Sequence, residues 1–184
     1  MLRRLATAGL LWIVLVSASR GADRPAQAPS PPQSQTQADH PKFEQLKKLV
    51  GTWVEADSNG QPTDKVVSVV RLTAGGSAVQ ETLFPGEPME MVSIYHMDNQ
   101  DLLMTHYCAL GNQPRMKADP ASAQNQIRWK FAGGTNLDPS KDMHMHSATV
   151  TFVDDDHIQI EGESWEGGKP SAEHCGVMKL VRKH

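Results

Sequence analysis

The stretch DHPKFEQLKKLVGTWV, residues 39–54, decides the fold, because the spacing of its apolar residues changes there from helical to extended. Asp39 is placed to cap a helix that carries Pro41 in its first turn. The apolar residues that follow recur at helical spacing and form one face: Phe43, Leu46, Leu49 and Val50. We expect a short amphipathic helix of about ten residues that leads directly into Gly51-Thr52-Trp53 on the first strand.

Beyond Trp53 the apolar residues alternate with a period of two, and no further segment has convincing helical spacing. Turn sequences such as A-G-G at 74–76 separate runs of alternating or β-branched residues. The predicted strands span 51–56, 65–73, 77–84, 88–97, 101–110, 114–118, 125–132, 143–153, 157–165 and 172–182. A sheet of about ten short strands protects its edges best by closing. The sequence therefore predicts an all-β protein, a single antiparallel up-and-down β-barrel preceded by a short helix.

The helix, the Gly51-Thr52-Trp53 that follows it and a cationic Arg182 on the last strand resemble the calycin superfamily of lipocalins, fatty-acid-binding proteins and nitrobindin-like barrels. The resemblance implies that Trp53 closes one end of the barrel and that Arg182 covers its ring in a cation–π contact. The run THYCALGNQPRM at 105–116, with HMH at 144–146, is similar to an uncharacterised group of exported bacterial proteins with a lipocalin-like domain. That likeness covers residues 40–184 and implies no established activity.

The first 22 residues have the layout of a secretory signal peptide. Arg3 and Arg4 precede an apolar run at 10–16, and small residues follow it. The run is too short to span a bilayer comfortably, although an uncleaved anchor is the alternative. We therefore expect export to the periplasm or the extracellular space and no stable membrane span after cleavage.

Residues 23–39 are rich in Pro and Gln and hold no large apolar side chain, so the sequence predicts a disordered linker there. The remaining residues, 40–184, are long enough for one domain with a sizeable core. Cleavage after residue 22 removes three arginines from the chain's 18 basic side chains and leaves 15 against 21 acidic ones, a net charge of −6. This balance argues against a nucleic-acid partner, which needs a clustered basic surface.

The densest run of reactive side chains is LLMTHYCALGNQPRMK at residues 102–117. It supplies His106, Tyr107, Cys108, Asn112, Gln113 and Arg115. A second cluster, DMHMH at 142–146, is expected to face it. Arg115 could grip a carboxylate or phosphate while Asn112 and Gln113 donate and accept at a pocket mouth. The alternative is a turn whose residues are chosen for their backbone conformation.

His144 and His146 share one face of a strand, with Cα atoms about 7 Å apart, and Ala148 and Val150 continue that face. The pair therefore points into the barrel. With His106 it could form a three-ligand site for a divalent transition metal such as zinc, with one open position. A hydrogen-bonded polar interior is the alternative.

Cys108 and Cys175 form an even count, which in an exported protein suggests a disulfide. Cys108 acting as a nucleophile with His106 is the other use of this thiol. Glu163 could act as a general base, although an outward solvated face explains it equally.

The sequence thus suggests an exported barrel that binds a small amphipathic ligand in the cavity of the barrel, which is expected to enclose several hundred Å³ and to be lined by apolar side chains and methionines. The expected ligand-binding residues are His106, Tyr107, Asn112, Gln113, Arg115, His144 and His146. A metal-dependent enzyme, with Glu163 or Tyr107 moving protons, is the alternative, and a nitrobindin-like haem site is a third. Whether the chain is an enzyme, and whether it holds a cofactor, stay open at this point.

Overall fold

The computed structural model describes residues 40–171 and 176–184, which form a closed antiparallel barrel of ten strands with one extra strand. A single α-helix of this part of the chain, α1 (Pro41–Lys47), precedes the barrel. The predicted fold class, an all-β barrel of lipocalin-like type after a short helix, is confirmed.

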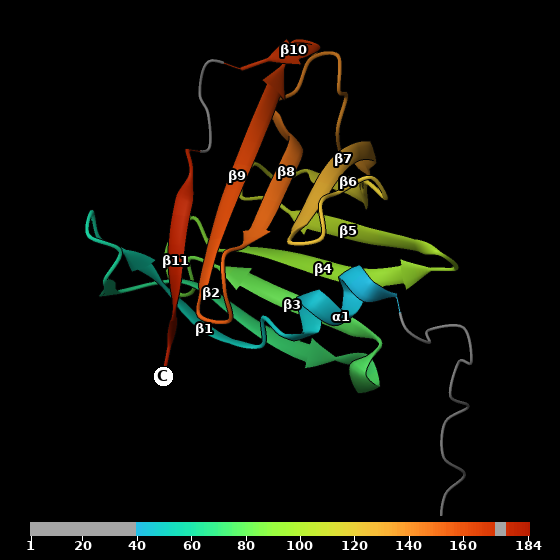
Figure 1. The fold of residues 1–184 in the computed structure, drawn as a ribbon. Helices are drawn as coiled ribbons and strands as arrows, with labels where there is room; N and C mark the ends of the chain where they lie inside the picture. The colour runs from blue at the N-terminus through green and yellow to red at the C-terminus, as the bar shows by residue number, and fades with distance from the viewer. Residues whose placement is uncertain (1–39, 172–175) are drawn as a thin grey trace, which may run out of the picture. The chain divides into compact units, whose positions relative to one another are not determined.

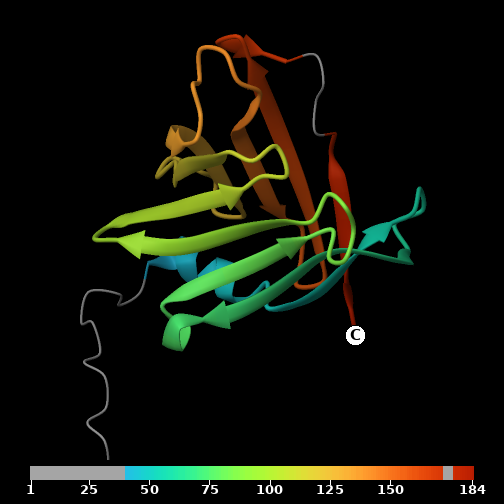
Figure 2. The same ribbon diagram turned by 180° about the vertical axis from the view of Figure 1, so that it is seen from behind.

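Strands follow one another around the barrel in chain order for most of its circumference (Figure 1). Their bounds are β1 (Gly51–Ala56), β2 (Pro62–Thr73), β3 (Ala78–Leu83), β4 (Met91–Asp98), β5 (Asp101–Tyr107), β6 (Gln113–Ala118), β7 (Gln126–Thr135), β8 (His144–Phe152), β9 (His157–Glu166), β10 (Lys169–Pro170) and β11 (Met178–Lys183). β11 lies between β9 and β1, and the pairing of β8 with β9 closes the ring. Figure 2 shows the same ring from behind. The two-residue β10 pairs only with the last residues of β9.

Several predicted boundaries need correction. The helix has seven residues rather than about ten, its N-cap is His40 without a side-chain cap, and Asp39 lies outside the described residues. Val50 is 41% exposed and does not join the buried helix face. The last strand begins at Met178, six residues later than predicted, with residues 172–175 outside the description. The predicted signal peptide and linker also lie outside it and stay predictions.

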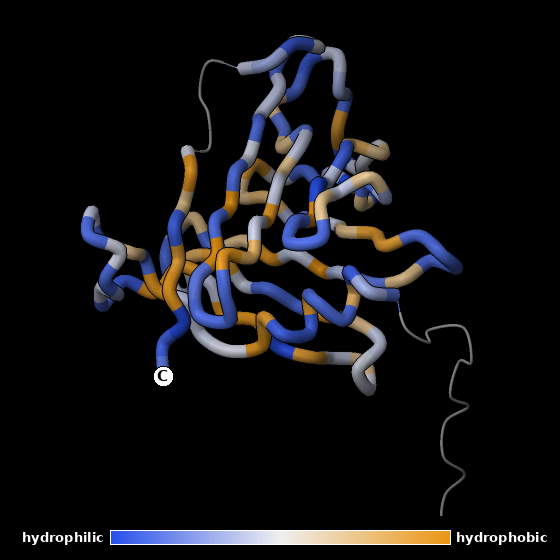
Figure 3. Tube along the Cα trace, viewed as in Figure 1, coloured by the Kyte–Doolittle hydropathy of each residue, from blue (hydrophilic) through white to orange (hydrophobic). Residues whose placement is uncertain are grey.

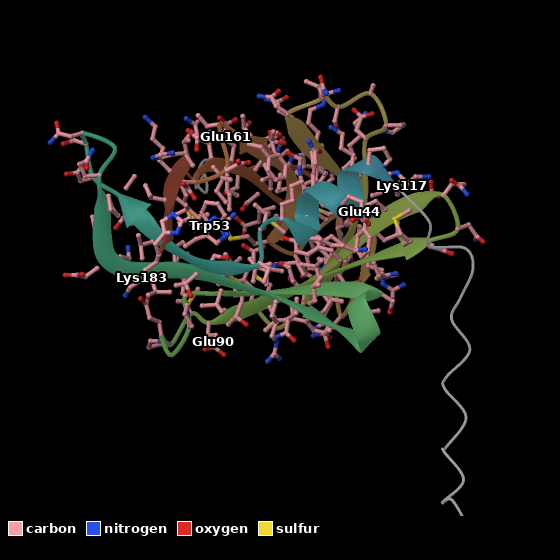
Figure 4. The ribbon with its side chains drawn as sticks, turned by 60° about the horizontal axis from the view of Figure 1, so that its bottom comes forward. Glu44, Trp53, Glu90, Lys117, Glu161 and Lys183 are labelled. Atoms are coloured by element: carbon pink, nitrogen blue, oxygen red, sulfur yellow. The ribbon has the colours of Figure 1, made fainter. Side chains whose placement is uncertain are left out.

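The helix plugs one end of the barrel. Phe43 and Leu46 of α1 are buried in the same core as Trp53, whose Nε1 donates to the carbonyl oxygen of Leu49 at 2.8 Å. The Arg182 guanidinium lies 4.4 Å from the Trp53 ring centroid and donates to the carbonyl oxygen of Val50 at 2.9 Å. Figure 4 shows Trp53 to the left of the helix that carries Glu44, among the side chains that the strands enclose. The predicted contact between Trp53 and Arg182 is therefore present.

Large side chains fill the middle of the barrel because alternate residues of each strand point inward. Figure 3 shows apolar and polar residues alternating along the strands. The largest buried side chains of the barrel wall include Trp129, Leu102, Met116, Ile127 and Leu180. Burying each such side chain stabilises the fold by about 1.5–3 kcal/mol. Over the described residues, no helix has the length and apolar character needed to cross a bilayer.

Candidate functional site

The end of the barrel away from α1 carries the candidate site. Because neighbouring strands run antiparallel, the ends of β1, β3, β5, β7 and β9 lie there with the starts of β2, β4, β6, β8 and β11. The connections at this end include 84–90 and 136–143, whereas 99–100 and 153–156 join strands at the α1 end. Long connections held by a rigid scaffold are where proteins most often place binding residues. We call this end the open end.

A pocket of about 360 Å³ opens there between β2 and β11. Its apolar lining residues are Ala56, Val67, Phe84, Val177, Met178 and Leu180. Glu55, Lys65 and Lys179 supply its charged groups, and Lys65 Nζ lies 3.4 Å from the Glu55 carboxylate. The pocket has the size that the sequence analysis predicts, but none of the seven expected ligand-binding residues lines it, and Met178 is its only methionine among the described residues.

Phe84 gives this pocket a strained wall. Its φ of 52° is in the left-handed region, which a bulky side chain rarely adopts, and Pro85 restricts the residue further. Its N–H donates to the carbonyl oxygen of Val67 at 2.8 Å, and its ring packs against the core. Strain of this kind persists only where the surroundings enforce it, and it gathers at binding sites.

A buried polar row crosses β3, β4 and β5. Glu81 pairs across strands with Ser93, and Ser93 pairs with His106. The Ser68 hydroxyl donates to one oxygen of the Glu81 carboxylate at 2.6 Å, and the Tyr95 hydroxyl donates to the other at 2.5 Å. Ser93 Oγ lies 3.0 Å from His106 Nδ1. The hydrogen-bonded polar interior, left open as an alternative by the sequence, is thus formed around His106.

Burial changes the pKa of two members of this row. It lowers the pKa of His106 to about 4, so this imidazole is neutral at pH 7. Burial, reinforced by the neighbouring Glu81 carboxylate, raises the pKa of Tyr95 well above its ordinary value, so the phenol stays protonated. Neither group has a pKa near neutrality, which a general acid or base working at pH 7 needs. The row is suited to hydrogen bonding more than to proton transfer.

A second cluster joins the start of β8 to the end of β9. His144 is fully buried, and its Nδ1 donates to the carbonyl oxygen of Asp142 at 2.8 Å. Its Nε2 lies 3.1 Å from Nδ1 of His146. The His146 ring stacks on Trp165, with centroids 3.7 Å apart and an interplanar angle of 10°, and on Phe131 at 4.9 Å. A β-bulge between Met145 and Ser147 lets both imidazoles reach this cluster.

Asn112 ties the turn after β5 to this cluster. It is 5% exposed, and its Nδ2 donates to the carbonyl oxygen of Met143 at 2.8 Å. The two reactive segments therefore meet at this point, as the sequence analysis expects. Its Oδ1 is buried and has no hydrogen-bond partner within residues 40–171 and 176–184. Gln113 accepts from Thr135 and donates to Gly111, which supports the turn interpretation for that residue.

Tyr107 and Arg115 do not line the barrel interior, and their role in ligand binding stays a prediction. Tyr107 is 50% exposed directly after buried His106, and exposed Arg115 separates buried Pro114 from buried Met116. Since successive side chains of a strand point to opposite faces, both lie on the outer surface.

The three histidines divide between two places. His106 bonds to Ser93, whereas His144 and His146 contact each other. In the part of the chain that the structure describes, no three His, Cys, Asp or Glu side chains gather closely enough to hold a metal ion. Cys108 lies in the turn after β5, not on a strand with His106, and Cys175 lies outside the described residues, so the disulfide stays a prediction. Glu163 accepts from the Ser147 hydroxyl at 3.2 Å.

Sequence reasoning missed Glu81, Ser93 and Trp165. Strand alternation could have found Glu81, because Val79 two residues earlier is a plain core residue on the same face. The contact of Trp165 with His146 depends on the bulge in β8, and no sequence pattern predicts this bulge.

Comparison with models of known protein families finds no match, and neither does comparison with curated proteins.

Proposed function

We propose that this chain is an exported barrel that binds a small amphipathic anion in the pocket at its open end. The observation that carries the proposal is a pocket of about 360 Å³ with apolar walls and lysines at its edge, in a barrel whose other end is plugged. Ligand pockets typically enclose about 300–1,000 Å³, with apolar walls and a few polar groups. Export rests on the pattern of residues 1–22.

The residues that line the pocket fit a ligand with an apolar body and an anionic head. Val67, Phe84 and Leu180 offer the walls for an apolar body. Lys179 is exposed at the edge, where it can meet an anionic head such as a carboxylate. Lys65 is partly neutralised by Glu55, so Lys179 is the side chain that selects for negative charge.

The test is titration of the protein with a fluorescent fatty-acid analogue. Lys179→Glu should weaken binding about tenfold, because it replaces an attraction to the carboxylate by a repulsion. Lys183→Glu is the matched control: Lys183 is exposed on the same strand, at the other end of the barrel, so this variant should bind like the parent. Equal weakening in both variants, or no saturable binding by the parent, would refute the proposal.

A further inference from the structure

His144 and His146 form a pair that the proposed ligand pocket does not use. The described residues that line the pocket come from β1, β2, β11 and the segments next to β3 and β11, whereas the histidines lie on β8. His144 is fully buried and His146 is partly buried, and the His146 ring is stacked between aromatic side chains.

The nitrogen atoms of this pair have the separation found in a metal chelate. His144 Nε2 and His146 Nδ1 are 3.1 Å apart and share a hydrogen bond, and an ion that binds both nitrogens would displace the shared proton. Imidazole nitrogens bind zinc at about 2.0–2.1 Å. If one ion binds both nitrogens at this distance, the nitrogen–metal–nitrogen angle is about 100°. This angle lies between the tetrahedral and square-planar values, which zinc and copper(II) respectively favour.

Surrounding contacts hold both rings in position for such an ion. The Nδ1–H of His144 is engaged by the carbonyl oxygen of Asp142, which leaves the lone pair on Nε2 and is a common second contact of metal-bound histidines. The His146 ring is fixed between Trp165 and Phe131. Both ligands are therefore oriented before any ion arrives.

Two buried polar atoms nearby have unmet hydrogen bonds. Asn112 Oδ1 and Trp165 Nε1 lack partners within the described ranges, 40–171 and 176–184. Asn112 is held at Met143, next to His144, and Trp165 pairs across strands with His144. Buried orphan atoms of this kind commonly mark a missing water or ion.

We propose that His144 and His146 bind one divalent transition-metal ion of the zinc or copper class. The protein supplies two nitrogen ligands, and the remaining positions are left to water or a small exogenous ligand. Since no third His, Cys, Asp or Glu of the described part of the chain lies close enough to bind the same ion, this site is an open one. His106 is not part of it.

Calorimetric titration of the chain with Cu²⁺ and, separately, Zn²⁺ tests the proposal. We expect saturable binding of one equivalent, and Cu²⁺ should quench tryptophan fluorescence because Trp165 is stacked on a ligand ring. His146→Phe keeps an aromatic ring between Phe131 and Trp165 but removes the nitrogen. It should lower the affinity at least about tenfold, as changes around metal ligands commonly do.

His157→Phe is the matched control, because His157 is a partly exposed histidine that bonds to Asp154 in the turn at the far end of β8 and β9. It should leave the affinity unchanged. Trp165→Phe should keep the binding and lose most of the quenching.

A second measurement uses only the parent chain, so it tests the proposal even if the His146→Phe variant fails to fold. The electron paramagnetic resonance spectrum of the Cu²⁺ complex of the parent should show coupling to two imidazole nitrogens. Absence of saturable binding, equal affinity of the parent and a folded His146→Phe variant, or a spectrum without imidazole nitrogens would each overturn the proposal. Binding of the fatty-acid analogue is measured separately, so failure of the metal site is distinct from failure of the pocket.

Discussion

His106 links the interior of the barrel to the pH dependence of its stability. Its pKa is about 4 in the folded protein because of burial, against an ordinary value of 6.5 in the unfolded chain. Between these values the unfolded state binds a proton that the folded state does not, so stability falls as the pH falls. The contribution is complete above pH 6.5 and is lost on acidification towards pH 4, a change on the order of 2–3 kcal/mol.

The measurement is chemical unfolding of the parent and of His106→Gln at several pH values from 7 to 4. The variant should be less stable at pH 7, since its side chain fits the Ser93 contact less well, but should lose less stability on acidification. His96→Gln, at a histidine of β4 that lies outside the polar row, should follow the parent. Parallel curves for the parent and His106→Gln would contradict the assignment.

Arg182 is a residue whose shape matters as much as its charge. Its guanidinium donates to the carbonyl oxygens of Lys48, Val50 and Asp155 while it covers Trp53. A lysine carries the same charge but cannot donate in several fixed directions at once. Arg182→Lys should therefore lower the free energy of unfolding by about 1–3 kcal/mol. Arg71→Lys, on the outer surface beside Gln80, should change it by less than about 0.5 kcal/mol. Urea unfolding of both variants checks this, and equal effects would contradict it.

At the scale of single elements, the sequence predicts strands better than connections. The alternation of inward and outward residues places β4 and β5 to within a few residues, because a strand with one buried face alternates apolar and polar side chains along the sequence. The sequence predicts that the turn after β5 is part of the strand, since Cys108 and Leu110 continue the alternation although they lie beyond its end. Local pattern cannot tell where pairing stops.

The candidate site follows the same division. His106 could be placed inside the barrel from its strand alone, and alternation puts Tyr107 on the opposite face. Nearness in sequence predicts that both serve one site, but neighbouring residues of a strand point to opposite faces of the sheet. The pocket, by contrast, is built from β2, Phe84 and β11, which are distant in the chain, so no local sequence motif could predict it.

The backbone strain in the segment 84–90 lies in Phe84, which has a left-handed conformation. Two substitutions of this residue measure the strain. Both Phe84→Ala and Phe84→Gly remove the ring from the pocket wall, so both should bind the fatty-acid analogue more weakly than the parent does. At an ordinary position alanine is the more stable of the two, but at a φ of 52° glycine avoids a penalty of about 1 kcal/mol. We expect Phe84→Gly to be at least as stable as Phe84→Ala in urea unfolding. A clearly more stable alanine variant would show that the left-handed conformation is not enforced.

At the scale of the whole molecule, the two ends of the barrel differ: the α1 end is suited to stabilising the fold and the open end to binding a ligand. The α1 end is closed by Phe43, Trp53 and Arg182, which are buried or held by several bonds. The open end keeps an apolar residue, Val177, 55% exposed in the pocket lining. Exposed apolar side chains that gather at a pocket commonly serve binding. Stability and ligand affinity should therefore respond to substitutions at different ends.

Phe43→Ala and Val177→Asp test this separation. Phe43→Ala removes a fully buried ring and should lower the free energy of unfolding by about 3–5 kcal/mol, while the folded fraction keeps the parent's affinity for the fatty-acid analogue. Val177→Asp changes an exposed side chain, so its stability should stay within about 0.5 kcal/mol of the parent. Its affinity should fall about tenfold, because an apolar contact is lost and a negative charge faces an anionic head. Since the two residues lie in different parts of the barrel, the double variant should show the sum of the two effects. Loss of affinity in folded Phe43→Ala would mean that the helix end shapes the pocket, and the two ends would then have to be treated as one coupled site.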